Sequence, residues 1–106
     1  MRSFEISQLL ANSRTSDDYY SEFLRVSSMS LGIYRLAAGR QDLQKPHKQD
    51  EIYVVQHGRA EIEVEGITQS VRPGSVVYVP ALAQHHFKEI TEDLEVLVFF
   101  APAEGD

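Results

Sequence analysis

The chain has 106 residues, a formal net charge of −6 and no cysteine. Its length allows one domain with a single core. The acidic balance, without a Lys/Arg cluster, excludes an ordinary nucleic-acid surface, and the lack of thiols excludes disulfides and cysteine-ligated zinc. No apolar run approaches the roughly 20 residues of a membrane helix, and the N-terminus lacks the features of a signal peptide. We therefore expect a cytoplasmic protein with small-molecule ligands and no nucleic-acid or membrane partner.

The predicted elements begin with a short helix and a loop over residues 1–20, because ISQLLAN contains no helix breaker and the segment 13–20 is acidic and polar. Eight β-type runs fill the predicted barrel region, residues 21–100. They cover 22–27, 30–39, 51–56, 59–66, 67–72, 75–80, 85–90 and 95–100, with turn residues between them, including 57–58 and 91–93. Residues 101–106 are predicted to be a tail. Many short strands in one small domain predict an all-β sandwich or barrel.

The apolar pattern of these runs predicts how they are covered. Apolar and acidic residues alternate over 60–65, which is typical of a half-buried antiparallel strand. The runs 75–80 and 95–100 are apolar on both faces, so their outer faces need cover from the N-terminal helix or from another subunit. We therefore expect a homodimer.

The stretch PHKQDEIYVVQHG, residues 46–58, contains a first group of polar residues that could act together. Side chains alternate along a strand, so Glu51 and Tyr53 share one face, and His47 reaches the same side if the chain before the strand is extended. An imidazole and a carboxylate on one wall favour a divalent-metal site. His57 directly precedes Gly58 at an expected turn, which favours a solvated loop position.

A second wall is predicted from the stretch 74–89. Pro80 ends one strand, and His85 and His86 open the returning one. Neighbours on a strand face opposite ways, so His85 and Phe87 share a side, and His86 is expected outside unless a bulge turns it inward.

The first stretch resembles the first signature motif of the small single-domain cupins, which are RmlC-like jelly-roll barrels. That motif runs glycine, five residues, His-x-His, three or four residues, Glu, six residues and glycine. Gly39, His47, Glu51 and Gly58 fit it, and Lys45 stands where the first histidine is expected.

The second stretch resembles the second motif of the same family, which runs glycine, five residues, Pro-x-Gly, two residues, His, three residues and Asn. Gly74, Pro80 and His85 fit it, while Leu82 and Glu89 replace a glycine and the asparagine. The two motifs together cover about half of the chain. The resemblance implies an all-β double-stranded β-helix, the cupin jelly-roll barrel, with the short N-terminal helix added to it.

The resemblance also implies that His47, Glu51 and His85 are metal ligands. Lys45 removes one ligand of the usual set, because a protonated lysine has no lone pair to donate. Iron, manganese, nickel or zinc would suit two imidazoles and one carboxylate. The alternative is a barrel that has lost its metal, in which the three side chains hydrogen-bond one another inside a pocket for a sugar or a small acid.

Four further residues are candidates for contact with a substrate. Tyr53 could act as a general acid, and is therefore the catalytic candidate, or could fill the barrel floor. Gln44 and Gln84 could contact the substrate or a metal-bound water, and Phe87 belongs to the same predicted substrate-binding set.

Two functions from different classes remain open at this point. The first is a metal-dependent isomerase or dioxygenase that acts on a small carbohydrate or carboxylic acid. The second is a non-catalytic barrel that binds a sugar or an acid without a metal. The fold alone cannot choose between them, since one barrel supports many chemistries.

Overall fold

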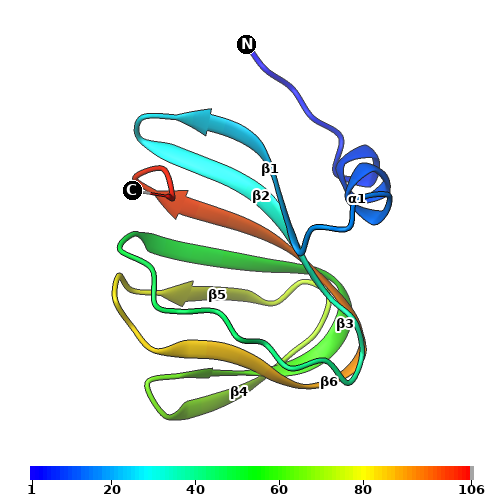
Figure 1. Cartoon of the computed structure of the whole chain (residues 1–106), viewed down its shortest axis with the longest axis vertical. Helices are drawn as coiled ribbons and strands as arrows, with labels where there is room; N and C mark the ends of the chain where they lie inside the picture. Colours follow the sequence, from blue (N-terminus) through cyan, green and yellow to red (C-terminus); the bar gives the residue numbers. More distant parts are fainter. Residues whose placement is uncertain (106) are drawn as a thin grey trace.

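A computed structural model describes residues 1–105, in which six strands form one curled antiparallel sheet and one helix lies outside it (Figure 1). The strand order is β1-β2-β6-β3-β4, and β5 pairs with β3. The predicted all-β fold with a short N-terminal helix is confirmed. The elements are α1 (Ile6–Arg14), β1 (Tyr20–Val26), β2 (Met29–Leu36), β3 (Asp50–Val64), β4 (Ile67–Val71), β5 (Val76–Val79) and β6 (His85–Ala101).

Two long strands replace four of the predicted short ones. The runs 51–56 and 59–66 are both part of β3, and 85–90 and 95–100 are both part of β6. The predicted turns at 57–58 and 91–93 are therefore wrong. The β3–β6 pairing shifts register between Val55 and Glu61, and such bulges bend a strand without ending it. Gly58 lies in this region with φ +94°, where a Cβ would stand 2.3 Å from the Asp93 carbonyl oxygen.

The inner face of the sheet forms the main core. Side-chain alternation on β3 is as predicted: Glu51, Tyr53 and Val55 are each at most 2% exposed, whereas Ile52 is 39% exposed. Because the barrel closes on this face, the acidic side chain of Glu51 lies inside it. The buried core residues are Leu36, Tyr53, Val55, Ala60, Ile62, Val71, Val79, Ala83, Phe87, Ile90, Leu94, Val96, Val98 and Phe100.

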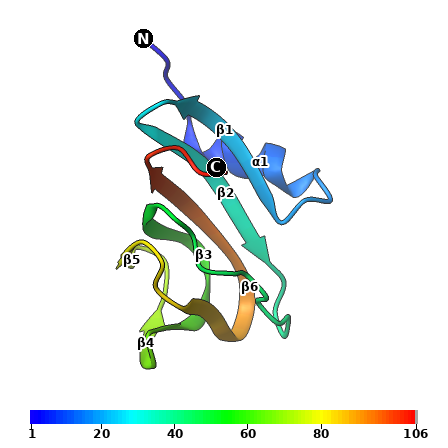
Figure 2. The same cartoon turned by 60° about the vertical axis from the view of Figure 1, so that its left-hand side comes forward.

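The helix covers part of the outer face, beside β1 and β2 (Figure 1, Figure 2). Leu10 packs there with Ile33 and Leu97 in a second, smaller core. Arg14, in the last helical turn, donates hydrogen bonds of 2.8 and 2.7 Å to the Glu95 carboxylate on β6. The N-terminal helix thus covers part of the outer apolar face of β6, which is one of the two possibilities that the sequence predicted. Within residues 1–105, no helix has the length and apolar character needed to span a membrane.

The segment after β6 folds back toward β2 (Figure 1). The Glu104 backbone N–H donates to the Ser30 hydroxyl at 2.9 Å, and Arg25 donates to the Glu104 carbonyl. The predicted tail began at residue 101, but Ala101 is the last residue of β6, and Asp106 lies outside the described residues. This path brings Glu104 to the mouth of the barrel.

Candidate metal centre

His47, Glu51 and His85 converge inside the barrel. One ligand atom from each lies within 4.8 Å of the other two, and His85 Nε2 is 3.2 Å from Glu51 Oε1. Glu51 stands at the start of β3, His85 is the first residue of β6, and His47 lies in the connection before β3. A 2.7 Å hydrogen bond from the Leu82 N–H to the His47 carbonyl joins the two loops that carry the imidazoles.

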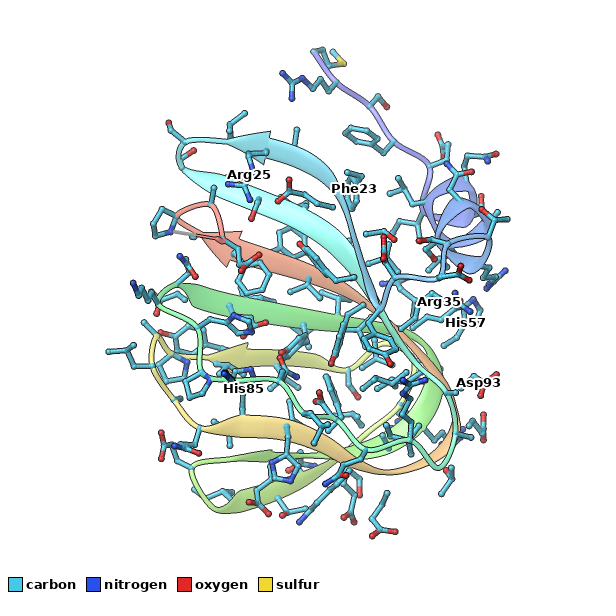
Figure 3. The ribbon with its side chains drawn as sticks, viewed as in Figure 1. Phe23, Arg25, Arg35, His57, His85 and Asp93 are labelled. Atoms are coloured by element: carbon cyan, nitrogen blue, oxygen red, sulfur yellow. The ribbon has the colours of Figure 1, made fainter. Side chains whose placement is uncertain are left out.

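His85 points inward, as the alternation predicted, and is 5% exposed (Figure 3). Its Nδ1 lies 2.9 Å from the Ala83 carbonyl, so this nitrogen carries a proton and Nε2 faces Glu51. Burial opposes the charged imidazole, but the Glu51 carboxylate and the Ala83 carbonyl together outweigh it, so the pKa of His85 is raised.

The three side chains fit a divalent transition metal in donor type, burial and spacing. Glu51 is 2% exposed, and its Oε1 has no hydrogen bond of good geometry within residues 1–105. An orphaned buried carboxylate oxygen is costly unless something positive meets it. Ligand atoms bound at about 2.1 Å to one ion lie about 3.0 Å apart at right angles and about 4.2 Å apart on opposite sides, so the trio, whose atoms lie within 4.8 Å of one another, would contract on binding an ion.

Gln44 enters the same space from the connection before β3. Its Oε1 accepts a 3.0 Å hydrogen bond from the Tyr53 hydroxyl and lies 3.3 Å from His47 Nε2 and 3.2 Å from His85 Nε2. The side chain of Lys45, which occupies the position of the missing histidine, is exposed. The amide of Gln44, rather than the side chain of Lys45, therefore contacts the two imidazoles.

Of the other predicted site residues, Tyr53 lies at the cavity described below, whereas Phe87 and Gln84 do not line it. Tyr53 is 1% exposed, and burial, together with the charge of Glu51, raises the pKa of its hydroxyl well above the ordinary value. Phe87 is 1% exposed and packs edge-on against Tyr53 at 4.9 Å between ring centroids. Gln84 is exposed and its backbone pairs with Glu65.

The two remaining histidines lie outside the trio. His86 is half-buried on β6 and pairs with Glu63 on β3. His57 is exposed and lies in β3 rather than in a loop, on the opposite side of the molecule from His85 (Figure 3).

A cavity of about 210 Å³ adjoins the trio. Its lining is aromatic and acidic, and none of the nine lining residues is a lysine or an arginine. They are Tyr20, Tyr34, Gln44, His47, Glu51, Tyr53, Val98, Phe100 and Glu104. The cavity can therefore offer hydroxyl groups, an amide and carboxylates to a small molecule.

Asp42 is a site residue that sequence reasoning missed. It is 6% exposed and accepts hydrogen bonds from Tyr34 Oη at 2.6 Å, Gln44 Nε2 at 2.7 Å and the Phe87 N–H at 2.8 Å. It lies in the spacer RQDLQ of the first motif, where no periodicity marks one residue above another. Its burial follows from tertiary contacts with Tyr34 on β2 and Phe87 on β6.

Tyr20 and Tyr34 were also missed. They pair across β1 and β2, and both line the cavity. Gly32 makes room for the Tyr20 ring, because a Cβ there would lie 2.3 Å from Tyr20 Cζ. The alternation of side chains along a strand could have shown which face each tyrosine occupies, but it does not show which strands form the cavity wall.

Comparison with known proteins agrees with this architecture. The cupin domain family matches residues 32–100. An uncharacterised protein of Streptomyces coelicolor is 51% identical over 105 residues, which are 99% of this chain and 100% of that protein.

Two solved structures share the fold. A Thermus thermophilus protein has a TM-score of 0.76 and 23% identity, covering 97% of this chain and 99% of its own. An RmlC-like cupin with a double-stranded β-helix, from Methanocaldococcus jannaschii, has a TM-score of 0.70 and 19% identity, covering 81% of this chain and 84% of its own.

Proposed function

The chain belongs to the cupin family, and from this premise we propose that it is a metal-dependent enzyme that isomerises a small, neutral, hydroxylated molecule of the carbohydrate type. The observation that carries the proposal is the trio of His47, Glu51 and His85, in which Glu51 and His85 are buried and His47 is half-buried, beside a cavity of about 210 Å³. Tetrahedral structural zinc sites are closed by their protein ligands, whereas an ion that keeps a coordination position open toward a cavity can bind a substrate there. Iron, manganese, nickel and zinc are all candidates for the ion.

The residues around the cavity have separable roles in this proposal. A bound divalent ion would polarise a carbonyl or hydroxyl oxygen of the substrate. Tyr53, with its raised pKa, stays protonated at neutral pH and can donate a hydrogen bond or a proton to an oxygen that becomes negative. Tyr20 and Tyr34, whose hydroxyls are also kept protonated by burial, would orient substrate hydroxyl groups.

The charge of the lining separates the two substrate classes that the sequence left open. Glu51 and Glu104 contribute carboxylates to the cavity, and no cationic side chain lines it. A carboxylic acid would find only the metal ion as a countercharge, whereas a neutral sugar could use both the carboxylates and the tyrosine hydroxyls. This balance favours the carbohydrate and, with a protonated tyrosine at hand, isomerisation over dioxygenation.

A second function is favoured by one specific observation. Gln44 Oε1 accepts a hydrogen bond from Tyr53 and lies within 3.3 Å of both imidazoles. In a metal-free barrel the amide would hold these groups together, provided that His85 carries a proton on Nε2. The protein would then bind a sugar-like molecule without turnover.

Elemental analysis decides between these functions. Protein without a histidine tag is analysed after incubation with iron(II), manganese, nickel and zinc, and compared with Glu51→Ala. The enzyme proposal predicts about one metal per chain in the natural protein and a large loss in the variant. If neither protein holds stoichiometric metal, the enzyme proposal is wrong and non-catalytic binding of a sugar-like molecule replaces it.

We also propose that the chain forms a homodimer. Three large apolar side chains on and after β5 are strongly exposed, namely Val76 at 67%, Tyr78 at 58% and Leu82 at 68%. They adjoin Ile52, whose register partner on β5 is Tyr78. Light scattering should give twice the 12.0 kDa chain mass, and a mass of one chain at micromolar concentration would contradict the dimer.

A further inference from the structure

The side-chain amide of Gln44 lies beside the trio of His47, Glu51 and His85. Its Oε1 is 3.2 Å from His85 Nε2 and 3.3 Å from His47 Nε2. Glu51 Oε1 also lies 3.2 Å from the same His85 nitrogen. Each of these two nitrogens and two oxygens therefore lies within 3.3 Å of at least one other member of the set.

Asp42 determines which end of the Gln44 amide faces this point. Gln44 Nε2 donates to Asp42 Oδ2 at 2.7 Å, and a carboxylate can only accept there. The amide oxygen must consequently point to the trio. Asp42 is itself held by the buried Phe87 N–H and by the Tyr34 hydroxyl, at 2.8 and 2.6 Å. The orientation of the amide is thus built into the barrel wall.

The spacing of the oxygen is that of a neighbouring ligand. Two atoms bound at right angles and about 2.1 Å from one ion lie about 3.0 Å apart. The distances from Gln44 Oε1 to the two imidazole nitrogens, 3.2 and 3.3 Å, are close to this value. Glutamine carbonyl oxygens are ordinary ligands of divalent cations.

We propose that Gln44 is the fourth protein ligand, through Oε1, and that Asp42 is the positioning residue that turns this oxygen toward the ion. This inference rests on the proposed function, because it requires that the trio binds a metal. Gln44 thereby replaces the histidine for which Lys45 is substituted, from one position earlier in the chain. The set becomes two nitrogens and two oxygens, and the harder oxygen donors favour manganese(II) more than a three-histidine set would.

The test measures manganese(II) binding to metal-free protein by electron paramagnetic resonance of the free ion. The variants are Gln44→Ala and Gln44→Asn, whose side chain is one methylene too short to reach. Gln41→Ala is the matched control, because Gln41 is exposed in the same segment. Far-UV circular dichroism checks the fold of each variant, and Gln44→Asn supplies the measurement if Gln44→Ala does not fold.

We expect one site per chain in the natural protein and the control, and a dissociation constant weakened about 10- to 100-fold in both Gln44 variants. The visible spectrum of bound cobalt(II) should also change in these variants, since it reports the ligand set. Equal affinity and spectra in the Gln44 variants and the control would overturn the role of Gln44 and leave the metal site of the proposed function intact. No binding of manganese(II) or cobalt(II) by the natural protein, together with no stoichiometric metal in the elemental analysis, would overturn both.

Discussion

Replacement of Asp42 by alanine should destabilise the metal-free protein by roughly 3 kcal/mol. The Phe87 N–H, buried at the start of β6, would lose its acceptor, which costs about 1–3 kcal/mol for an unsatisfied donor. The Tyr34 and Gln44 bonds to the carboxylate would be lost as well, but these groups line the cavity, where water can replace part of the loss. Asp42→Asn keeps one acceptor oxygen and should cost only about 1 kcal/mol.

Urea denaturation at pH 7 measures this effect. Asp50→Ala is a suitable control, because Asp50 also accepts two hydrogen bonds, from the Ala81 N–H at 2.9 Å and the Tyr78 hydroxyl at 3.2 Å, but it is exposed. The control should lose less than about 1 kcal/mol. If Asp42→Ala were no less stable than the control, the carboxylate would not anchor the wall and its assignment as a positioning residue would fail.

Three further outcomes follow from other contacts. Arg14 holds the pKa of the Glu95 carboxyl below its ordinary value of 4.5, so the contribution of this ion pair to stability is present above pH 4.5 and is lost as the pH falls through the lower folded pKa. In the Glu95→Gln variant the urea midpoint should therefore depend less on pH below 4.5 than in the natural protein. Parallel curves of urea midpoint against pH for the two proteins would contradict this. Gly32→Ala places a methyl group 2.3 Å from the Tyr20 ring, so a crystal structure should show that ring displaced, with a loss of about 1–3 kcal/mol; an unmoved ring would be inconsistent with the packing. Phe87→Ala should cost about 3–5 kcal/mol in urea denaturation, as a core aromatic does, whereas a cost below about 1 kcal/mol would indicate a pocket-facing residue.

Some features of the site are local, and the sequence alone was enough to predict them. Residues 51–55 alternate between the two faces of β3 because successive strand side chains point in opposite directions. The same rule placed His85 inside and His86 outside. The family motifs then brought His47, Glu51 and His85 together, and the structure gathers them within 4.8 Å.

The strand count depended on contacts between distant segments. The pair His57–Gly58 has the residues of a turn, yet β3 continues through it, since β3 stays paired with β6 on both sides of the register shifts and Asp93 of β6 lies too close to Gly58 for a side chain there. A turn and a bulge use the same flexible residues. Only the partner strand decides which of them forms.

The sequence by itself predicted an all-β sandwich or barrel with Glu51 and His85 facing inward, because the two-residue period of a strand is carried by neighbours in the chain, and the resemblance to the two cupin motifs added His47 to this set. The tertiary structure alone decided that Asp42 is buried and that Gln44 turns its amide oxygen to the centre. Both depend on the Phe87 N–H, which lies 45 residues from Asp42 in the chain. A buried carboxylate adopts the orientation that satisfies its donors, and here those donors meet only when the barrel closes.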